Sequence, residues 1–133
     1  MMADELEALA RRCEAAEGSS DELDLAIVQW ARDNQVSGLC GYEGPPNYDC
    51  ALWLDRYGPI TASLDAAMSL MPKSDEQTAT FWQVGNDGAG GEPSDYLARV
   101  LVCSNLTSRE YRSVCATPAL ALCAAALRAR NPA

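Results

Sequence analysis

The chain has 133 residues, of which 48% are hydrophobic, so it has the size of a single domain whose core needs neither a metal nor a disulfide to hold it together. Nineteen acidic and ten basic residues give a net charge of −9, which disfavours direct binding to nucleic acid or to an anionic membrane. The absence of histidine excludes the hydrolase triads and most of the zinc sites that depend on imidazole. We therefore expect a binding protein, with no enzymatic activity, metal or cofactor.

The N-terminus and the cysteines indicate the compartment. Residues 1–5 are acidic, whereas a secretory signal is basic and then apolar, and no apolar run approaches the roughly 18 residues that span a bilayer. We expect a cytoplasmic protein whose six cysteines are free thiols. Cys40 and Cys50 flank a loop rich in glycine and proline, and a reversible bond between these two is left open.

Two amphipathic helices are predicted at the N-terminal end. Apolar residues recur at helical spacing within residues 3–17, and Gly18 follows as a stop signal. Ser19 or Ser20 can cap a second helix, in whose first turn acidic residues stabilise the positive end. The two helices form a hairpin. Their acidic residues lie mostly off the apolar stripes, which leaves open a merely solvated face or a face that binds a partner.

Residues 34–57 form an insert rich in glycine and proline that also gathers aromatic residues. Four of the eight tyrosines and tryptophans of the chain fall here, namely Tyr42, Tyr48, Trp53 and Tyr57. They can fold back over the core as a lid, or they can form a recognition loop whose rings anchor a partner. A short strand or a helical turn is expected at residues 50–54.

The middle of the chain predicts one more helix and then a small antiparallel sheet. Residues 59–72 have helical spacing, with Thr61 or Ser63 as the cap and Pro72 at the end. The period then changes to two, which predicts strands at 78–84 and 96–103 and a third at 111–115. The loop at 85–93 lacks the Gly-Lys-Ser/Thr ending of a phosphate-binding loop and is interpreted as a hairpin connection.

The C-terminal segment, residues 116–130, predicts a helix that is too apolar for a surface position. Thr117 can cap it, Pro118 occupies a position where its missing N–H is not needed, and Arg128 and Arg130 meet the negative end. The apolar stripe consists of Leu120, Cys123, Ala124 and Leu127. We expect a buried helix that closes an α+β fold.

Residues 60–72 and 116–127, together with residues 23–27, resemble the phage ABA sandwich family, which are small proteins of phages and prophages. The resemblance implies an α-β-α sandwich with the sheet between helices. The expected fold is thus a single domain over residues 1–133, with an N-terminal helical hairpin, a central antiparallel sheet of about three strands and a buried C-terminal helix. The resemblance also places the protein in a bacterial host cell.

The charge and the resemblance together favour a phage-encoded inhibitor of a bacterial defence system. We expect an anti-CRISPR protein that imitates DNA and binds a basic surface of a Cas effector subunit or of another host defence protein. The candidate partner-binding residues are Asp4, Glu7, Glu14, Glu17, Asp21, Glu22, Tyr42, Glu43, Tyr48, Asp49, Trp53, Asp55 and Tyr57.

Two other functions are left open. The first is a phage accessory or assembly protein that acts only by association, and self-association as a homodimer is also left open. The second is a sponge for a nucleotide signal, which needs converging cations and aromatic rings. The candidates for such a site are Lys73, Arg99, Arg109 and Arg112, with Tyr111 or Trp82.

Overall fold

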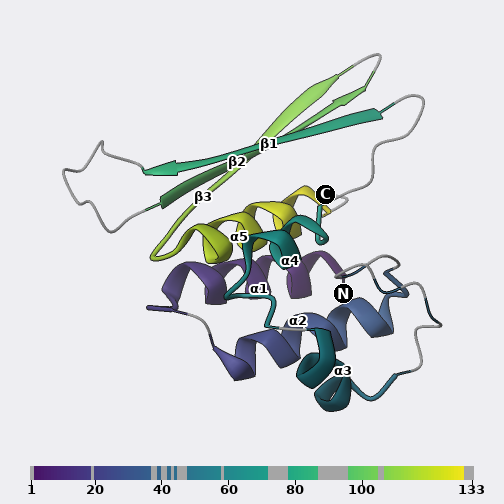
Figure 1. Ribbon diagram of the computed structural model, residues 1–133. Helices are drawn as coiled ribbons and strands as arrows, with labels where there is room; N and C mark the ends of the chain where they lie inside the picture. The colour runs from purple at the N-terminus through teal and green to yellow at the C-terminus, as the bar shows by residue number, and fades with distance from the viewer. Residues whose placement is uncertain are drawn as a thin grey trace.

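The computed structural model describes residues 2–18, 20–36, 39, 42, 44, 48–57, 59–71, 78–86, 96–104 and 107–130. These residues form an α+β fold, which confirms the predicted helical hairpin, three-stranded antiparallel sheet and C-terminal helix on the sheet (Figure 1). The elements in chain order are α1 (Met2–Ala15), α2 (Asp21–Asp33), α3 (Cys50–Tyr57), α4 (Leu64–Met68), β1 (Thr78–Asn86), β2 (Tyr96–Ser104), β3 (Ser108–Cys115) and α5 (Pro118–Ala129).

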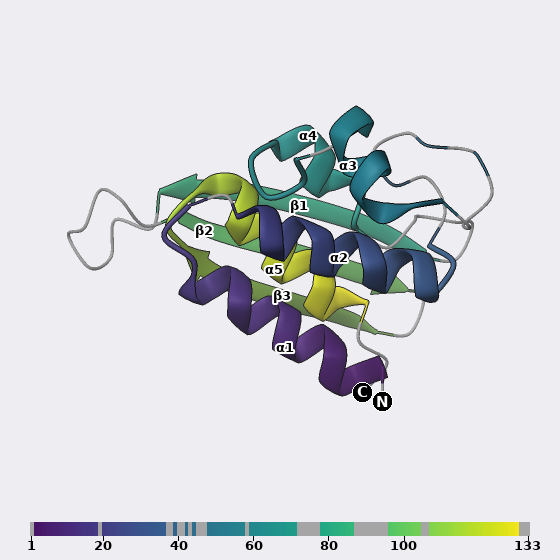
Figure 2. The ribbon, with the colours of Figure 1, turned by 90° about the horizontal axis from the view of Figure 1, so that it is seen from below.

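The described helices all lie on one side of the sheet, as the two ribbon views show (Figures 1 and 2). Helix α5 packs mainly on β2 and β3, and α1 and α4 pack on α5 in turn. Helix α5 therefore occupies the central layer. The family resemblance implied that the sheet would lie in that layer, between helices. This position explains its composition, because a helix that is apolar on every side must be covered on every side. All residues from Ala119 to Leu127 are buried.

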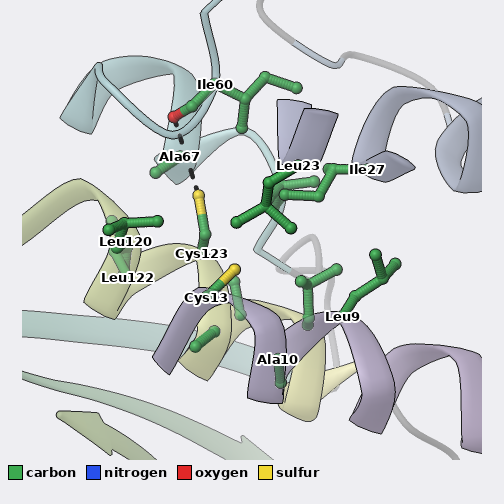
Figure 3. Packing of buried hydrophobic residues seen from close by; sticks show 14 of the residues in the cluster. Leu9, Ala10, Cys13, Leu23, Ile27, Ile60, Ala67, Leu120, Leu122 and Cys123 are labelled. Carbon is green, nitrogen blue, oxygen red and sulfur yellow. Dashed lines mark hydrogen bonds between the residues drawn. The ribbon is translucent and has the colours of Figure 1, made fainter. Parts of the chain in front are cut away.

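The core lies between α5 and the helical hairpin. Figure 3 shows Cys13 of α1, Leu23 of α2 and Cys123 of α5, which belong to one buried cluster. The Cys123 thiol donates a hydrogen bond to the Ile60 carbonyl oxygen over 3.8 Å, which ties α5 to the segment that precedes α4. At the end of α5, Arg130 donates to the Leu70 and Met71 carbonyl oxygens. These contacts bring the C-terminal helix and the N-terminal half into one core.

The sheet has the order β1-β2-β3, with Trp82 opposite Val100 and Val100 opposite Tyr111. Alternate residues therefore point to opposite faces. Ala98 and Val100 are buried against α5. The other face, which we call the outer sheet face, is turned away from the described helices. It consists of Ala79, Phe81, Gln83, Gly85, Leu97, Arg99, Leu101, Cys103, Ser108, Glu110, Arg112 and Val114.

Local signals in the sequence mark several helix starts correctly. Ser20, Ser63 and Thr117 accept hydrogen bonds from backbone N–H groups three residues on, at 3.3, 3.3 and 3.2 Å. Pro118 stands in the first turn of α5, as predicted. The third predicted helix is shorter than residues 59–72, and Ser63 is its cap. Thr61, the other candidate, is bound to Asp24 instead.

The remaining differences concern the insert and the third strand. Residues 50–57 form helix α3, so the helical alternative for residues 50–54 is confirmed and extended. Asp49 favours this helix because its Oδ1 accepts from the N–H groups of Ala51 and Leu52, at 3.0 and 3.2 Å. Strand β3 begins at Ser108, three residues before the predicted start. The loop predicted at 85–93 lies largely outside the described residues.

The described cysteines are free thiols, as expected. Burial raises the pKa of both Cys13 and Cys115 to about 12, so neither thiol is ionised near neutral pH. Burial also raises the pKa of Cys50. Cys40, the other member of the pair left open above, lies outside the described residues.

Candidate functional site

A groove of about 540 Å³ runs between α2 and α3 and carries acidic residues on both walls. We call it the acidic groove. Asp21 and Asp55 are exposed on its rim, and Glu22 is exposed beside Asp21 in the first turn of α2. The helix N-terminus favours acidic residues at this position, because its unpaired N–H groups carry partial positive charge. Within the described part of the chain, none of these three carboxylates forms an ion pair. The groove is lined by Asp21, Asp24, Leu25, Ala51, Leu54, Asp55 and Pro59.

Asp24 contributes to the same groove but has a structural partner. Its side chain is 2% exposed, and its Oδ1 accepts from both the N–H and the hydroxyl of Thr61, each at 2.7 Å. The Thr61 hydroxyl oxygen in turn accepts from the Ser20 N–H at 3.2 Å. This chain of hydrogen bonds fixes the start of α2 against the segment before α4. The floor of the acidic groove is therefore held rigidly, while its rim stays charged and exposed.

Arg128, near the C-terminal end of α5, engages two of the predicted partner-binding residues. Its guanidinium donates to both Glu7 carboxylate oxygens, at 3.2 and 3.1 Å, and to both Glu14 oxygens, at 2.7 and 2.8 Å. It also donates to the Ser113 hydroxyl oxygen at 2.8 Å, so the cluster joins α1, α5 and β3. Hydrogen bonding from Arg128 lowers the pKa of Glu7, and hydrogen bonds to Glu14 and Glu7 raise the pKa of Arg128. Glu7 and Glu14 are thus partly exposed but paired with a cation of the fold itself.

The structure places the other predicted acidic residues separately. Asp4 is exposed in the first turn of α1, and Glu17 is exposed after the end of α1. Asp49 is exposed but caps α3, as described above. Glu43 lies outside the described residues. Of the acidic candidates, the structure therefore brings Asp21 and Asp55 to one concave surface. Glu22 stands next to Asp21 in the first turn of α2, and the other described acidic candidates lie at separate points.

The four aromatic candidates of the insert contact one another. Trp53 lies between Tyr48 and Tyr57, with ring centroids 5.4 and 5.1 Å away, and Tyr42 stands edge-on to Tyr48 at 5.3 Å and to Tyr57 at 5.5 Å. Trp53 is 3% exposed, and the three tyrosines are half-buried against the core. This arrangement matches a lid over the core. The partly exposed edges of the tyrosines are what remains available to a partner.

The cations proposed for a nucleotide site are divided between the two faces of the sheet. Arg99 and Arg112 are opposite each other on the outer sheet face, and both contact the Glu110 carboxylate. Hydrogen bonding from Arg99 lowers the pKa of Glu110. Arg109 and Tyr111 are paired with Val102 and Val100, which places them on the opposite face. Lys73 lies outside the described residues, so the described part of the set does not converge.

The groove on the outer sheet face was not among the sites predicted from the sequence. A groove of about 490 Å³ lies there, lined by Phe81, Trp82, Gln83, Arg99, Leu101, Ser108 and Glu110. Phe81, Leu101 and Val114 are exposed to 59, 36 and 41%. The signal was present in the sequence, because β2 is apolar at successive positions and thus apolar on both faces. Such a strand predicts burial on both sides, but the described helices cover only one.

The chain was compared with known proteins, and its described residues were searched for metal sites and membrane-spanning helices. Comparisons with protein-family models, with curated proteins and with solved structures give no match. No group of three or more cysteine, aspartate or glutamate side chains among the described residues is arranged to hold a metal ion. None of the described helices combines the length and the apolar character needed to cross a bilayer.

Proposed function

We propose that this protein is an inhibitor that binds a basic, nucleic-acid-binding surface of a bacterial defence protein through its acidic groove. The observation that carries this proposal is the separation of charge along the chain. Residues 1–71 contain 13 acidic and four basic residues, a net charge of −9, and residues 72–133 contain six of each, a net charge of zero. The whole net charge of the protein therefore belongs to the half that forms α1 to α4.

The geometry of the acidic groove supports binding to a cationic surface. Asp21 and Asp55 line a concavity whose floor is fixed by the hydrogen bonds between Asp24 and Thr61. Carboxylates on a rigid frame need little rearrangement on binding, and a concentrated negative field attracts a basic partner from a distance. Such a surface competes with nucleic acid for the same lysines and arginines.

The resemblance of residues 60–72 and 116–127 to phage proteins supports a Cas effector subunit as the partner. Effectors of this kind hold nucleic acid in a positively charged channel. A phage protein with an acidic groove is suited to block such a channel without touching nucleic acid itself. We therefore assign the protein an anti-CRISPR role in the cytoplasm of a bacterial host.

One observation favours a second function, that of a phage accessory protein that acts only by association. The outer sheet face exposes Phe81, Leu101 and Val114, which is the kind of apolar surface that marks association sites. The two functions differ in their response to salt. Binding through the acidic groove weakens as salt rises, whereas binding through apolar side chains is retained or strengthened.

The proposal is tested by charge reversal with a matched control. The test variant carries Asp21→Lys and Asp55→Lys, and the control carries Asp65→Lys and Asp33→Lys. Both variants raise the net charge by four, both replace exposed residues, and both change one acid at the start and one at the end of a helix. The measurement is the concentration of each protein that displaces half of a labelled DNA from a purified Cas effector complex.

We expect the test variant to need at least about tenfold more protein for the same displacement, equivalent to about 1.4 kcal/mol, because it removes two charges from the binding surface. The control should change the value less than about threefold. Equal losses in both variants would show that net charge alone drives the effect. An unchanged test variant, or the absence of displacement by the wild-type protein, would contradict the proposed function.

A further inference from the structure

The two edges of the sheet differ in a way that bears on association. Strand β3 carries Arg109, Glu110 and Arg112, and charges of this kind prevent an edge strand from pairing with another chain. Strand β1 is nine residues long and contains neither a charged residue nor a proline. It is an edge strand, because β2 is its neighbour on one side and no other described strand pairs with it. Among the described residues, one edge of the sheet is therefore protected by charges, and the other is uncharged and unpaired.

The side chains of β1 are exposed on both faces of this uncharged edge. Phe81 is 59% exposed and belongs to the outer sheet face, and the next residue, Trp82, is 36% exposed and points to the other face. Helix α5 packs mainly on β2 and β3, which leaves β1 as the least covered strand. An added strand would cover both rings at once, in addition to pairing the backbone groups of the edge.

We infer that β1 pairs with β1 of a second copy of this chain, antiparallel and with the twofold axis at Trp82, so that two three-stranded sheets join into one of six strands. This inference goes beyond the proposed function, because it assigns a surface that the acidic groove does not use. Antiparallel pairing about the central residue of a nine-residue strand uses the full length of the edge.

The register about Trp82 is self-complementary. Trp82 meets the second Trp82, Phe81 meets Gln83, and Thr80 meets Val84. Ala79 and Gly85 face each other as two small residues, and a Cβ placed on Gly85 has no atom within 4 Å. Cross-strand pairs of aromatic and β-branched side chains stabilise a sheet, and no like charges are opposed along this seam. The seam therefore needs no partner of different composition.

Charge and hydrogen bonding both favour a second copy at this edge. A chain with a net charge of −9 repels its copy most where residues 1–71 meet, and β1 is a neutral segment outside that half. In antiparallel strands alternate residue pairs exchange two hydrogen bonds, so nine residues give about eight to ten. A typical protein interface contains about ten. The edge alone thus supplies the usual number of direct hydrogen bonds.

Oligomeric state, measured by sedimentation of the full chain at low and moderate salt, tests this inference. We expect a dimer that tightens as salt screens the repulsion between two acidic chains. Phe81→Lys should weaken the dimer at least about tenfold, because it places a charge on the uncharged edge. Val114→Lys is the matched control: it puts the same residue on the same outer sheet face, but on β3. A dimer that stacks its outer faces would weaken in both variants, and an edge-paired dimer only in the first.

Disulfide trapping tests the register independently. Cα atoms of directly opposed residues lie about 4.5 to 5.5 Å apart, within the range of a disulfide, so Trp82→Cys should give a covalent dimer on mild oxidation. Gln83→Cys should not, because two copies of residue 83 lie diagonally at about 7 to 8 Å. Far-UV circular dichroism verifies that each variant is folded. A wild-type protein that is monomeric at both salt concentrations, equal effects of the two lysine variants, or equal trapping at both cysteines would overturn the inference.

The salt response separates this inference from the proposed function. Binding through the acidic groove should weaken as salt rises, whereas pairing through β1 should strengthen. If the Asp21→Lys, Asp55→Lys variant loses displacement but remains a dimer, the result supports the acidic groove and is consistent with pairing through β1. If Phe81→Lys loses the dimer but still displaces DNA, the result supports pairing through β1 and is consistent with binding through the acidic groove.

Discussion

The half of the molecule that forms α1 to α4 and the half that forms the sheet and α5 expose different chemistry to solvent. The first half carries the entire net charge and presents carboxylates around a concave surface, whereas the second is neutral overall and exposes Phe81, Trp82 and Leu101. Helix α5 joins the second half to the first, because its residues from Ala119 to Leu127 are buried between the sheet and the helices α1 and α4. One buried helix thus allows a small protein to keep a charged surface and an apolar surface apart.

The largest expected effect concerns the buried helix α5. Leu120 is fully buried in α5, and Leu120→Ala should lower the free energy of unfolding by about 2 to 5 kcal/mol, because it leaves a cavity between the sheet and the helices. The measurement is urea denaturation monitored by circular dichroism. Leu52→Ala on α3, where the side chain is 71% exposed, should change stability by no more than about 0.5 kcal/mol. Similar losses in both variants would contradict the central position of α5.

The second expected effect concerns Arg128 of α5, which forms ion pairs with acidic residues of α1. Arg128→Met removes the guanidinium from the partly exposed Glu7 and Glu14 and should cost about 1.5 to 3 kcal/mol at pH 7, because hydrogen bonds between charged groups are lost. The pKa of Glu7 is lowered from its ordinary value of 4.5 in the folded state, so this stabilisation is present above that value and is lost as the pH falls through the folded pKa. The difference in stability between wild type and variant should therefore shrink below about pH 4.5. A constant difference down to pH 3 would contradict the ion-pair cluster.

The third effect separates a structural acid from the functional ones in the acidic groove. Asp24→Ala leaves the N–H and the hydroxyl of Thr61 without their acceptor and should cost about 1 to 2 kcal/mol. Asp24→Asn keeps an oxygen in place and should cost less. Asp21→Asn, on the exposed rim, should change the free energy of unfolding by about 0.5 kcal/mol or less. Thermal unfolding of the three variants gives this ranking, and a cost at Asp21 as large as at Asp24 would remove the distinction.

The smallest effect concerns the aromatic lid beside the acidic groove. A Cβ on Gly44 would lie 2.5 Å from the ring carbon Cζ of Tyr42, so Gly44→Ala must displace this ring from Tyr48 and Tyr57. We expect a loss of about 1 kcal/mol and a weaker near-ultraviolet circular dichroism signal from the packed rings. The far-ultraviolet signal should be unchanged. A near-ultraviolet spectrum identical to that of the wild type would contradict the packing of the cluster.

Features set by residues close together in the chain are predicted from the sequence, and features set by residues far apart in the chain are not. The caps at Ser20, Ser63 and Thr117 and the strands with alternating residues were predicted because these signals act within a few residues. The ion pairs of Arg128 were not, since Glu7 and Glu14 lie more than 100 residues away in the chain. Long-range pairing is set by the fold as a whole and leaves no local pattern.

The same limit applies to the candidate site. The sequence identifies Asp21 and Asp55 as candidates but does not show that they share one groove, because they lie on two helices whose packing is set by the fold as a whole. It also favours burial of β2 on both faces, because Val100, Leu101 and Val102 follow one another in this strand. Exposure of the outer sheet face depends on which face of the sheet the helices cover. The pattern of apolar residues does not indicate this face.

The most direct test of the separation of charge is the dissociation constant of the protein and a DNA-free Cas effector complex, measured from low to moderate salt. We expect a steep, log-linear weakening with salt and competition by DNA, because the acidic groove and the nucleic acid would occupy the same basic surface. Binding that is insensitive to salt, or no binding at any salt concentration, would contradict the central role given to the acidic half.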